Sequence, residues 1–338
     1  MPYSAANFAT SYRSTLARYV EAGEESQLEE AFALGRAACA NGATILELVD
    51  VHRSAVCTLF ESRGATATAT LDASFTFLAE ALATFEMTQR GYWEAHESVR
   101  RERAIALMLQ NDLMPTALPV VEGLDLAVRY LPGGTDTHAG GDWYDVFELD
   151  DGRVGLVVGD VTGHGVAAAA TMGQMRIAVL AYALGGREPS GVIEDLDVLV
   201  HRLGAGNIAT MIYVTADIAH HHLVVSTAGH PPPVLVGPDG SSGLIDGAHG
   251  RIVGVNPAPV DRDQVQVPFL PGSHLLLYSD GLVETVERAG QDGLALLVEA
   301  TDGFAGTAEE LCDHVLATVA PEGSRDDICI LAATLTPG

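Results

Sequence analysis

The sequence changes character at Pro115 and Pro119, and this change limits the possible folds more than any other feature. Before it, apolar side chains recur every three to four residues, as in amphipathic helices. After it, short Val, Leu and Ile runs are separated by Gly, Pro and Asp-Gly pairs, the pattern of strands joined by turns. The 338 residues allow two domains at roughly 100–200 residues each. We therefore expect a helical domain followed by a domain that contains strands.

Two helices of ordinary length are expected near the N-terminus. One follows Glu24 and ends at Asn41-Gly42, a common C-terminal cap. The next begins at Thr44, which forms a capping-box pattern with Glu47, and continues to Arg63-Gly64.

A third helical signal, from about 71 to 114, is longer than an ordinary globular helix. Part of it should therefore connect two domains. The charged stretch Arg100–Arg103 is best interpreted as a solvated helix face. A docking surface is the alternative interpretation. We assign 1–90 to a helical regulatory domain, 91–118 to a linker helix and 119–338 to the second domain. The apolar stripe expected to be buried in this helix is Leu71, Phe75, Leu78, Leu82 and Phe85.

The second domain is expected to be α+β with an antiparallel core, because its strands and helices come in blocks without strict alternation. The strand-like stretches are 124–130, 142–149, 153–160, 208–217, 221–228, 233–237, 264–270, 273–279 and 327–335. The helical stretches are 165–184, 190–203 and 307–319.

The charge excludes several classes of partner and enzyme. The 18 basic and 45 acidic residues give a net charge of −27, which repels phosphate backbones and anionic lipid surfaces. We expect no nucleic-acid partner and no membrane partner. Every basic residue is arginine, so P-loop, kinase and Schiff-base mechanisms that need a lysine are excluded.

The remaining composition indicates a soluble, cytoplasmic protein. Cys39, Cys57, Cys312 and Cys329 lie far apart without a Cys-x-x-Cys pair, so neither a zinc ribbon nor a dithiol redox motif is expected. The N-terminus lacks a basic region followed by an apolar stretch. We also expect no apolar run to reach the roughly 18–20 residues of a membrane span.

The most informative pattern is a pair of acidic residues on two adjacent strands. The Asp-Asp-Gly turn at 150–152 predicts a hairpin whose midpoint places Asp142 opposite Asp160. Facing side chains in such a pair have Cβ atoms about 4.5–5.5 Å apart. Two carboxylates at that spacing repel each other unless a cation lies between them.

Further acidic residues lie at the ends of other apolar strands. Asp280 follows one such strand and precedes Gly281, and Asp326 and Asp327 come directly before another. Asp-Gly pairs also mark turns that carry no chemistry, but three such motifs together favour a site. Carboxylate oxygens with glycines that let backbone carbonyls approach are typical of Mg²⁺ or Mn²⁺ sites.

The order of these motifs closely resembles the SpoIIE/RsbU branch of the metal-dependent protein phosphatases, the protein phosphatase 2C-like family. The resemblance covers about 119–335. Residues 8–96 resemble the N-terminal helical domain of RsbU through Tyr12–Tyr19, Ile45–Arg53 and Glu94–His96. The phosphatase motifs are Gly140-Gly-Asp-Trp-Tyr-Asp145, Gly159-Asp-Val-Thr-Gly-His-Gly165, Ala228-Gly-His-Pro-Pro-Pro233, Leu277-Tyr-Ser-Asp-Gly-Leu-Val283 and Ser324-Arg-Asp-Asp-Ile328.

The resemblance implies a sandwich of two antiparallel sheets flanked by helices, with two Mn²⁺ or Mg²⁺ ions at one edge. Asp160 would bridge the ions, with Asp142 and the carbonyl of Val161 on one ion and Asp280 and Asp326 on the other. A metal-activated water would then hydrolyse the phosphoester without a phosphoenzyme intermediate.

The resemblance also implies a biological setting. The substrate would be phosphoserine or phosphothreonine on a small anti-anti-sigma-factor-like protein in a bacterial stress or developmental pathway. Independently of the resemblance, the long uninterrupted helical signal that leads into the second domain motivates the hypothesis that an activating protein partner binds the N-terminal domain. The long helix also makes a homodimer plausible. No arginine directly precedes Asp142, as it does in some members of the wider family. Arg129 is the nearest upstream candidate for holding phosphate, although a strand-surface role fits it better.

Two alternative functions remain open at this point. Gly140-Gly141-Asp142 is also similar to the Gly-Gly-Asp/Glu-Glu-Phe signature of dinucleotide cyclases, but Trp143 occupies the position where an acid is expected. The other alternative is a catalytically inactive phosphatase-like scaffold. Every carboxylate expected of an active phosphatase is present, which argues against an inactive scaffold.

Several histidines are also candidates. His164, beside Asp160, could relay a proton or could shape the loop. His230, before three prolines, is expected to be structural. His220, His221 and His222 cannot all converge on one ion if they lie on a strand, because consecutive side chains point to alternate faces. We expect a turn there.

Overall fold

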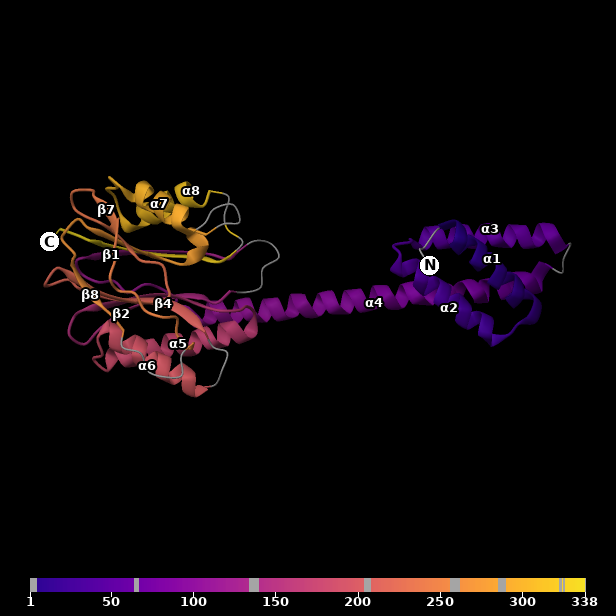
Figure 1. The fold of residues 1–338 in the computed structure, drawn as a ribbon, viewed down its shortest axis with the longest axis horizontal. Helices are drawn as coiled ribbons and strands as arrows, with labels where there is room; N and C mark the ends of the chain where they lie inside the picture. The colour runs from indigo at the N-terminus through magenta and orange to yellow at the C-terminus, as the bar shows by residue number, and fades with distance from the viewer. Residues whose placement is uncertain are drawn as a thin grey trace. The chain divides into compact units, whose positions relative to one another are not determined.

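The computed structural model describes residues 5–63, 67–133, 140–203, 208–255, 262–284, 290–321, 324 and 326–337. The expected helix stop at Gly64, and Arg325 of the last phosphatase motif, lie outside these residues. The chain divides into two compact units, Met1–Arg100 and Arg101–Gly338. Their folds agree with the expected α+β class preceded by helices (Figure 1).

The first unit consists of helices that pack around an aromatic core. Tyr12 and Phe77 are fully buried, with rings in an edge-to-face arrangement at 5.2 Å. Thr44 and Glu47 form the expected capping box, because each backbone N–H donates to the other's side chain. The helices are α1 (Ala5–Ala22), α2 (Glu25–Ala40), α3 (Ile45–Arg63) and the beginning of α4 (Ala67–Leu113).

The buried face of α4 in this unit differs from the expected stripe. Phe75 is 61% exposed and Leu71 is 37% exposed, whereas Phe77 and Ala81 are fully buried. A Cβ atom at Gly35 of α2 would lie 2.1 Å from the carbonyl oxygen of Ala81. The small residues of α2 and α4 therefore set which face is buried, because they allow the two backbones to approach closely.

The second unit is a sandwich of two antiparallel five-stranded sheets, as the resemblance implied. The first sheet has the order β1-β10-β9-β6-β7 and consists of β1 (Leu124–Leu131), β10 (Ile328–Leu335), β9 (His274–Tyr278), β6 (Val234–Val236) and β7 (Ser242–Leu244). The second has the order β2-β3-β4-β5-β8 and consists of β2 (Asp142–Glu148), β3 (Val154–Val161), β4 (Ala209–Asp217), β5 (His222–Ala228) and β8 (Val265–Pro268).

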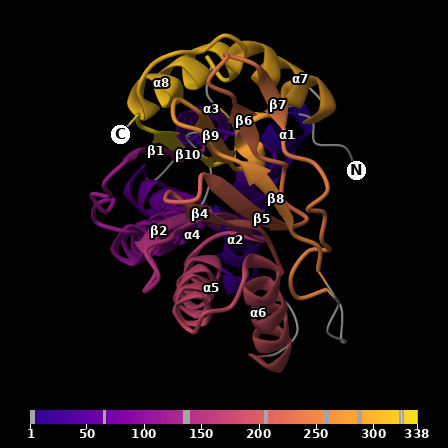
Figure 2. The same cartoon turned by 90° about the vertical axis from the view of Figure 1, so that its left-hand side faces the viewer.

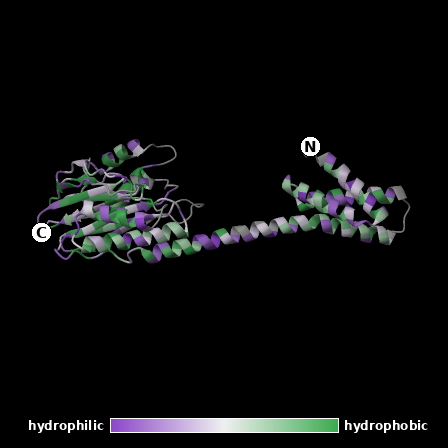
Figure 3. Cartoon of the chain, turned by 60° about the horizontal axis from the view of Figure 1, so that its bottom comes forward, coloured by the Kyte–Doolittle hydropathy of each residue, from purple (hydrophilic) through white to green (hydrophobic). Residues whose placement is uncertain are grey.

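Each sheet buries one face against the other sheet and one against helices. Figure 2 shows α7 (Gly290–Thr301) and α8 (Ala308–Val319) over the first sheet, and α5 (Val166–Leu184) and α6 (Pro189–Leu203) over the second. Strands that are covered on both faces, such as β3, β9 and β10, are largely apolar in sequence. Figure 3 shows hydrophobic stretches within the sandwich. The strand-like stretches all form strands, while β7, α7 and a 3-10 turn at Asp280–Leu282 were not expected.

One helix in the described part of the chain, α5, has the length and composition of a membrane span. It has 19 residues and a mean hydropathy of 1.3, so the expectation that no apolar run reaches this length was wrong. However, 44% of that window is buried inside the unit. Arg176, in the middle of the helix, donates to Asp145 of β2 at 2.8 Å. Packing on the second sheet therefore explains the apolar composition of α5.

Candidate metal centre

The β2–β3 hairpin brings Asp142 and Asp160 directly opposite each other, as the position of the turn predicted. Asp142 begins β2, and Asp160 is the next-to-last residue of β3. The neighbouring pairs, Trp143 with Gly159 and Tyr144 with Val158, are in the same register. A Cβ atom at Gly159 would lie 2.3 Å from the indole of Trp143. The indole thus occupies the space over Gly159, which favours this register.

Asp142 is buried without full compensation of its charge. Its side chain is 2% exposed, and its Oδ2 atom has no hydrogen-bond partner. Burial, and then the negative charge of Asp160, raise the pKa of Asp142 well above its ordinary value. A buried carboxylate oxygen without a partner costs about 1–3 kcal/mol or more. A cation at this position would remove that cost.

Asp280 and Asp326 contribute to the same negative potential. Burial raises the pKa of Asp160 to about 7, and the charges of Asp280 and Asp326 add to this shift. Burial, followed by the charge of Asp326, also raises the pKa of Asp280. The two residues come together because Asp280 follows β9 and Asp326 precedes β10, the neighbouring antiparallel strand.

A glycine allows the backbone of Val161 to approach this site. A Cβ atom at Gly141 would lie 2.0 Å from the carbonyl oxygen of Val161, a distance that real side chains do not reach. The Val161 N–H donates to the carbonyl of Gly141 at 3.1 Å. Only glycine at 141 is compatible with this contact, so the position of the Val161 carbonyl depends on it.

The donor set fits a hard divalent cation. It consists of carboxylate oxygens and a backbone carbonyl, the ligands that Mg²⁺ and Mn²⁺ prefer. Among the described residues, no three His, Cys, Asp or Glu side chains are arranged closely enough to hold an ion without movement. Ion binding would therefore require the carboxylates to move closer together.

The structure adds Asp327, which the sequence did not single out as a site residue. Its side chain is 4% exposed, and its Oδ1 atom accepts from the Gly133 N–H at 2.8 Å. Its Oδ2 atom accepts from the hydroxyl of Tyr130 and, at 3.4 Å, from the side-chain amide of Gln110. The only sequence signal was the second aspartate of the doublet before β10.

The other candidate residues lie in structural or surface positions. Arg129 is ion-paired with Glu309 and Asp313 of α8, which fits the expected strand-surface role. His164 is exposed in the loop between β3 and α5.

The remaining histidines also have positions that favour structural roles. His230 is buried, with its ring nitrogens 3.1 Å from the Thr210 hydroxyl and 3.0 Å from the Tyr278 carbonyl, and burial lowers its pKa to about 4. His220 and His221 lie in the expected turn, and His222 begins β5. The three therefore do not form a histidine metal site.

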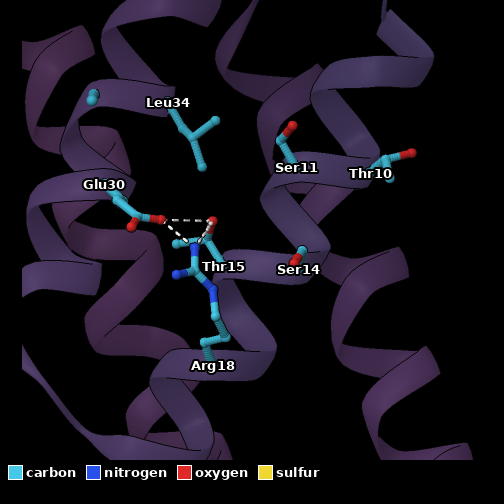
Figure 4. Close-up of a pocket in the computed structure, with 8 residues that line it drawn as sticks. Thr10, Ser11, Ser14, Thr15, Arg18, Glu30 and Leu34 are labelled. Carbon is cyan, nitrogen blue, oxygen red and sulfur yellow. Dashed lines mark hydrogen bonds and ion pairs between the residues drawn. The ribbon is translucent and has the colours of Figure 1, made fainter.

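A cavity in the first unit lies among residues of α1 and α2 (Figure 4). It has a volume of about 610 Å³, and hydroxyl groups of Thr10, Ser11 and Ser14 line one side. Arg18 on this cavity is ion-paired with Glu30. The pair neutralises the charge that could attract an ionic ligand, so this cavity supports no catalytic assignment.

Comparison with known families assigns both parts of the chain. Residues 150–336, more than half of the chain, match the family described as stage II sporulation protein E (SpoIIE). The chain belongs to the SpoIIE family. Residues 10–88 match the N-terminal domain of the phosphoserine phosphatase RsbU. The chain is accordingly a protein serine/threonine phosphatase, and this result favours the phosphatase over the cyclase alternative.

Individual relatives agree with the assignment. The chain is 25% identical over 311 residues to "Phosphoserine phosphatase RsbU" of Bacillus subtilis, covering 90% of each chain. It is 27% identical over 192 residues to "Phosphoserine phosphatase RsbP" of the same organism, covering 55% of this chain and 46% of RsbP.

Solved structures show the same fold. The RsbU and RsbW domains of Rv1364c from Mycobacterium tuberculosis match with 31% identity and a TM-score of 0.58, covering 67% of this chain and 64% of that one. RsbX, solved in complex with magnesium, matches with 16% identity and a TM-score of 0.52, covering 65% of this chain and 99% of RsbX.

Proposed function

We propose that this phosphatase hydrolyses phosphoserine or phosphothreonine on a small anti-anti-sigma-factor-like protein, using two Mn²⁺ or Mg²⁺ ions. The observation that carries the proposal is the Asp142–Asp160 pair, in which a buried carboxylate oxygen has no partner beside other negative charges. The names of RsbU and RsbP as phosphoserine phosphatases support the substrate class. The fusion of RsbU and RsbW domains in Rv1364c supports a partner in the same kind of pathway.

Each residue of the site has a defined task in this proposal. Asp160 would contact both ions, Asp142 and the carbonyl of Val161 would hold one ion, and Asp280 and Asp326 would hold the other. When bound, the ions would supply an activated water and neutralise charge on the phosphoryl group.

We also propose that the N-terminal domain regulates the enzyme. In this arrangement 1–90 is the regulatory domain, 91–118 is the linker helix and 119–338 is the phosphatase domain. An activating protein partner binds the regulatory domain and acts through α4, which runs without interruption from one unit into the other. Exposed apolar side chains on α4, such as Trp93 at 73% and Met108 at 59%, are compatible with a homodimer. A cytoplasmic location remains a prediction.

Hydrolysis of p-nitrophenyl phosphate tests the proposed chemistry. We expect turnover with added Mn²⁺, loss of turnover with EDTA, and recovery when excess Mn²⁺ is restored. Comparison of a phosphoserine peptide with a phosphotyrosine peptide then tests the substrate class. Absence of hydrolysis of every substrate with either metal would instead support the inactive-scaffold alternative.

Deletion of 1–90 tests the proposed regulation. We expect either altered basal turnover of p-nitrophenyl phosphate or loss of the response to the activating partner, because coupling requires the partner to favour one of two states. Equal turnover in the full chain and the deletion variant, each with and without the partner, would refute the regulatory role.

A further inference from the structure

The last turns of α4 are attached to the candidate metal centre through Gln110. This side chain is 3% exposed, although glutamine is usually found at the surface. Its Nε2 atom donates to the hydroxyl of Tyr130, to the carbonyl of Gly140 at 3.3 Å and to Oδ2 of Asp327 at 3.4 Å. All of these atoms belong to the second unit, so the network lies within one compact body.

The chemistry of these neighbours requires an amide at position 110. The Gly140 carbonyl and the Asp327 carboxylate can only accept hydrogen bonds. The hydroxyl of Tyr130 donates its single hydrogen to Asp327, so it can only accept from Gln110. A glutamate at this position would therefore place a second negative charge against acceptors. An apolar side chain would remove the donor to the Gly140 carbonyl and leave Asp327 with one donor fewer.

Asp327 in turn contacts the segments that carry three of the proposed ligands. A Cβ atom at Gly140, two residues before Asp142, would lie 2.3 Å from Oδ2 of Asp327. A Cβ atom at Gly281, the residue after Asp280, would lie 2.1 Å from the Asp327 carbonyl oxygen. The Asp327 N–H donates to Oδ1 of Asp326 at 2.9 Å. One residue thus sets the distances among these segments.

A second contact fixes the end of α4. Arg176 of α5 donates to the Leu113 carbonyl at 2.7 Å and to Asp145 of β2 at 2.8 Å. A Cβ atom at Gly173 would lie 2.7 Å from the side chain of Leu113. The end of α4 is therefore held both by the Gln110 hydrogen bonds and by the contacts of Leu113 with α5. Together these contacts hold the amide of Gln110 at a defined position relative to Asp327.

We infer that Gln110 is a positioning residue, which acts through Asp327 to set the geometry of the carboxylates that bind metal. This inference rests on the metal site of the proposed function and assigns to that site a residue from the helix that precedes the phosphatase sandwich. Gln110 touches neither the ions nor the substrate in this assignment. Its loss changes metal affinity because the segments at 140, 281 and 326 are no longer held by a fully hydrogen-bonded Asp327.

Direct measurement of Mn²⁺ binding to the full chain tests the inference. The free Mn²⁺ signal in electron paramagnetic resonance gives the dissociation constant without any enzyme assay. We expect Gln110→Met, which keeps the size of the side chain but removes its donors, to weaken Mn²⁺ binding about 10-fold or more, as is usual for residues that orient metal ligands. Gln110→Glu should weaken it further, because the new carboxylate faces Asp327.

Matched variants separate positioning from general damage to the fold. Gln174→Met makes the same change at an exposed site on α5 and should leave Mn²⁺ affinity unchanged. Tyr130→Phe removes one oxygen atom from the network and should also weaken binding, which keeps the test valid if Gln110→Met does not fold. The double variant should weaken Mn²⁺ binding by less than the product of the two single fold-changes, because both substitutions act on Asp327.

Asp142→Asn distinguishes failure of this inference from failure of the proposed function. Normal Mn²⁺ affinity in Gln110→Met and Tyr130→Phe, with weakened affinity in Asp142→Asn, would overturn the role of Gln110 alone. Normal affinity in Asp142→Asn as well would overturn the metal site, and the inference with it.

Discussion

Asp160→Asn should lower turnover of a phosphorylated substrate by more than about 100-fold, which exceeds the loss typical of residues that only support a metal ligand. The substitution keeps the shape of the side chain but removes the charge of the proposed bridging ligand. It also removes one of several negative charges that repel one another at this edge of the sandwich. The thermal unfolding midpoint in metal-free buffer should therefore equal or exceed that of the parent. Steady-state kinetics with saturating Mn²⁺, together with thermal unfolding, provide the measurement.

Asp150→Asn is the matched control for this substitution. Asp150 lies in the exposed turn of the same hairpin, so this variant should retain the parent's turnover. Turnover of Asp160→Asn within 10-fold of the parent would contradict the assignment of Asp160 as bridging ligand. A lower unfolding midpoint would contradict the charge-repulsion account instead.

Gly141→Ala should both destabilise the second unit and reduce turnover. The added methyl group would meet the Val161 carbonyl oxygen at 2.0 Å and the Val161 nitrogen at 2.7 Å, and these backbone atoms can move only with the strand. Overpacking of this kind costs about 1–3 kcal/mol of unfolding free energy. A displacement of the Val161 carbonyl by about 1 Å can reduce turnover about 100-fold. Urea unfolding and steady-state kinetics measure the two effects separately.

Gly243→Ala provides the control for the alanine substitution. This glycine lies in β7, and a Cβ atom there would meet no atom within 4 Å. The control should therefore retain parental turnover. If Gly141→Ala unfolds at the parental urea midpoint and keeps parental turnover, the close contact between Gly141 and Val161 has no functional importance.

Local sequence patterns were sufficient to predict the hairpin that carries two of the candidate ligands. The turn at 150–152 determines the pairing, and a shift by one residue would turn the apolar side chains of β3 to the opposite faces. The observed pairing of Asp142 with Asp160 confirms that prediction. The helix caps at Thr44 and at Asn41-Gly42 were predictable for the same reason, since each depends on residues a few positions apart.

Features that depend on tertiary contact were not predictable in this way. Phe75 and Phe77 both fit a helical period, and only the packing of α2 against α4 decides that Phe77 is buried. Strand β7 has only three residues, Ser242–Leu244, and carries no strong strand signal. Its hydrogen bonds to β6 make it a strand, although its sequence does not predict one.

The Gln110–Asp327 contact shows the same limit for the candidate site. These residues are separated by 217 positions. No recognisable catalytic sequence motif contains both of them. Glutamine near the end of a helix predicts a solvent-exposed side chain, whereas the structure buries it against acceptors. The aspartate doublet at 326 and 327 identified the region, but it did not reveal that Asp326 is exposed whereas Asp327 is buried.

Anomalous X-ray diffraction from crystals of the full chain grown with Mn²⁺ is the most direct test of the proposed metal centre. The account predicts two anomalous peaks at the edge of the sandwich, with Asp160 bound to both, Asp142 and the Val161 carbonyl on one, and Asp280 and Asp326 on the other. Mn²⁺ peaks elsewhere, or none within bonding distance of these carboxylates under conditions that support turnover, would contradict it.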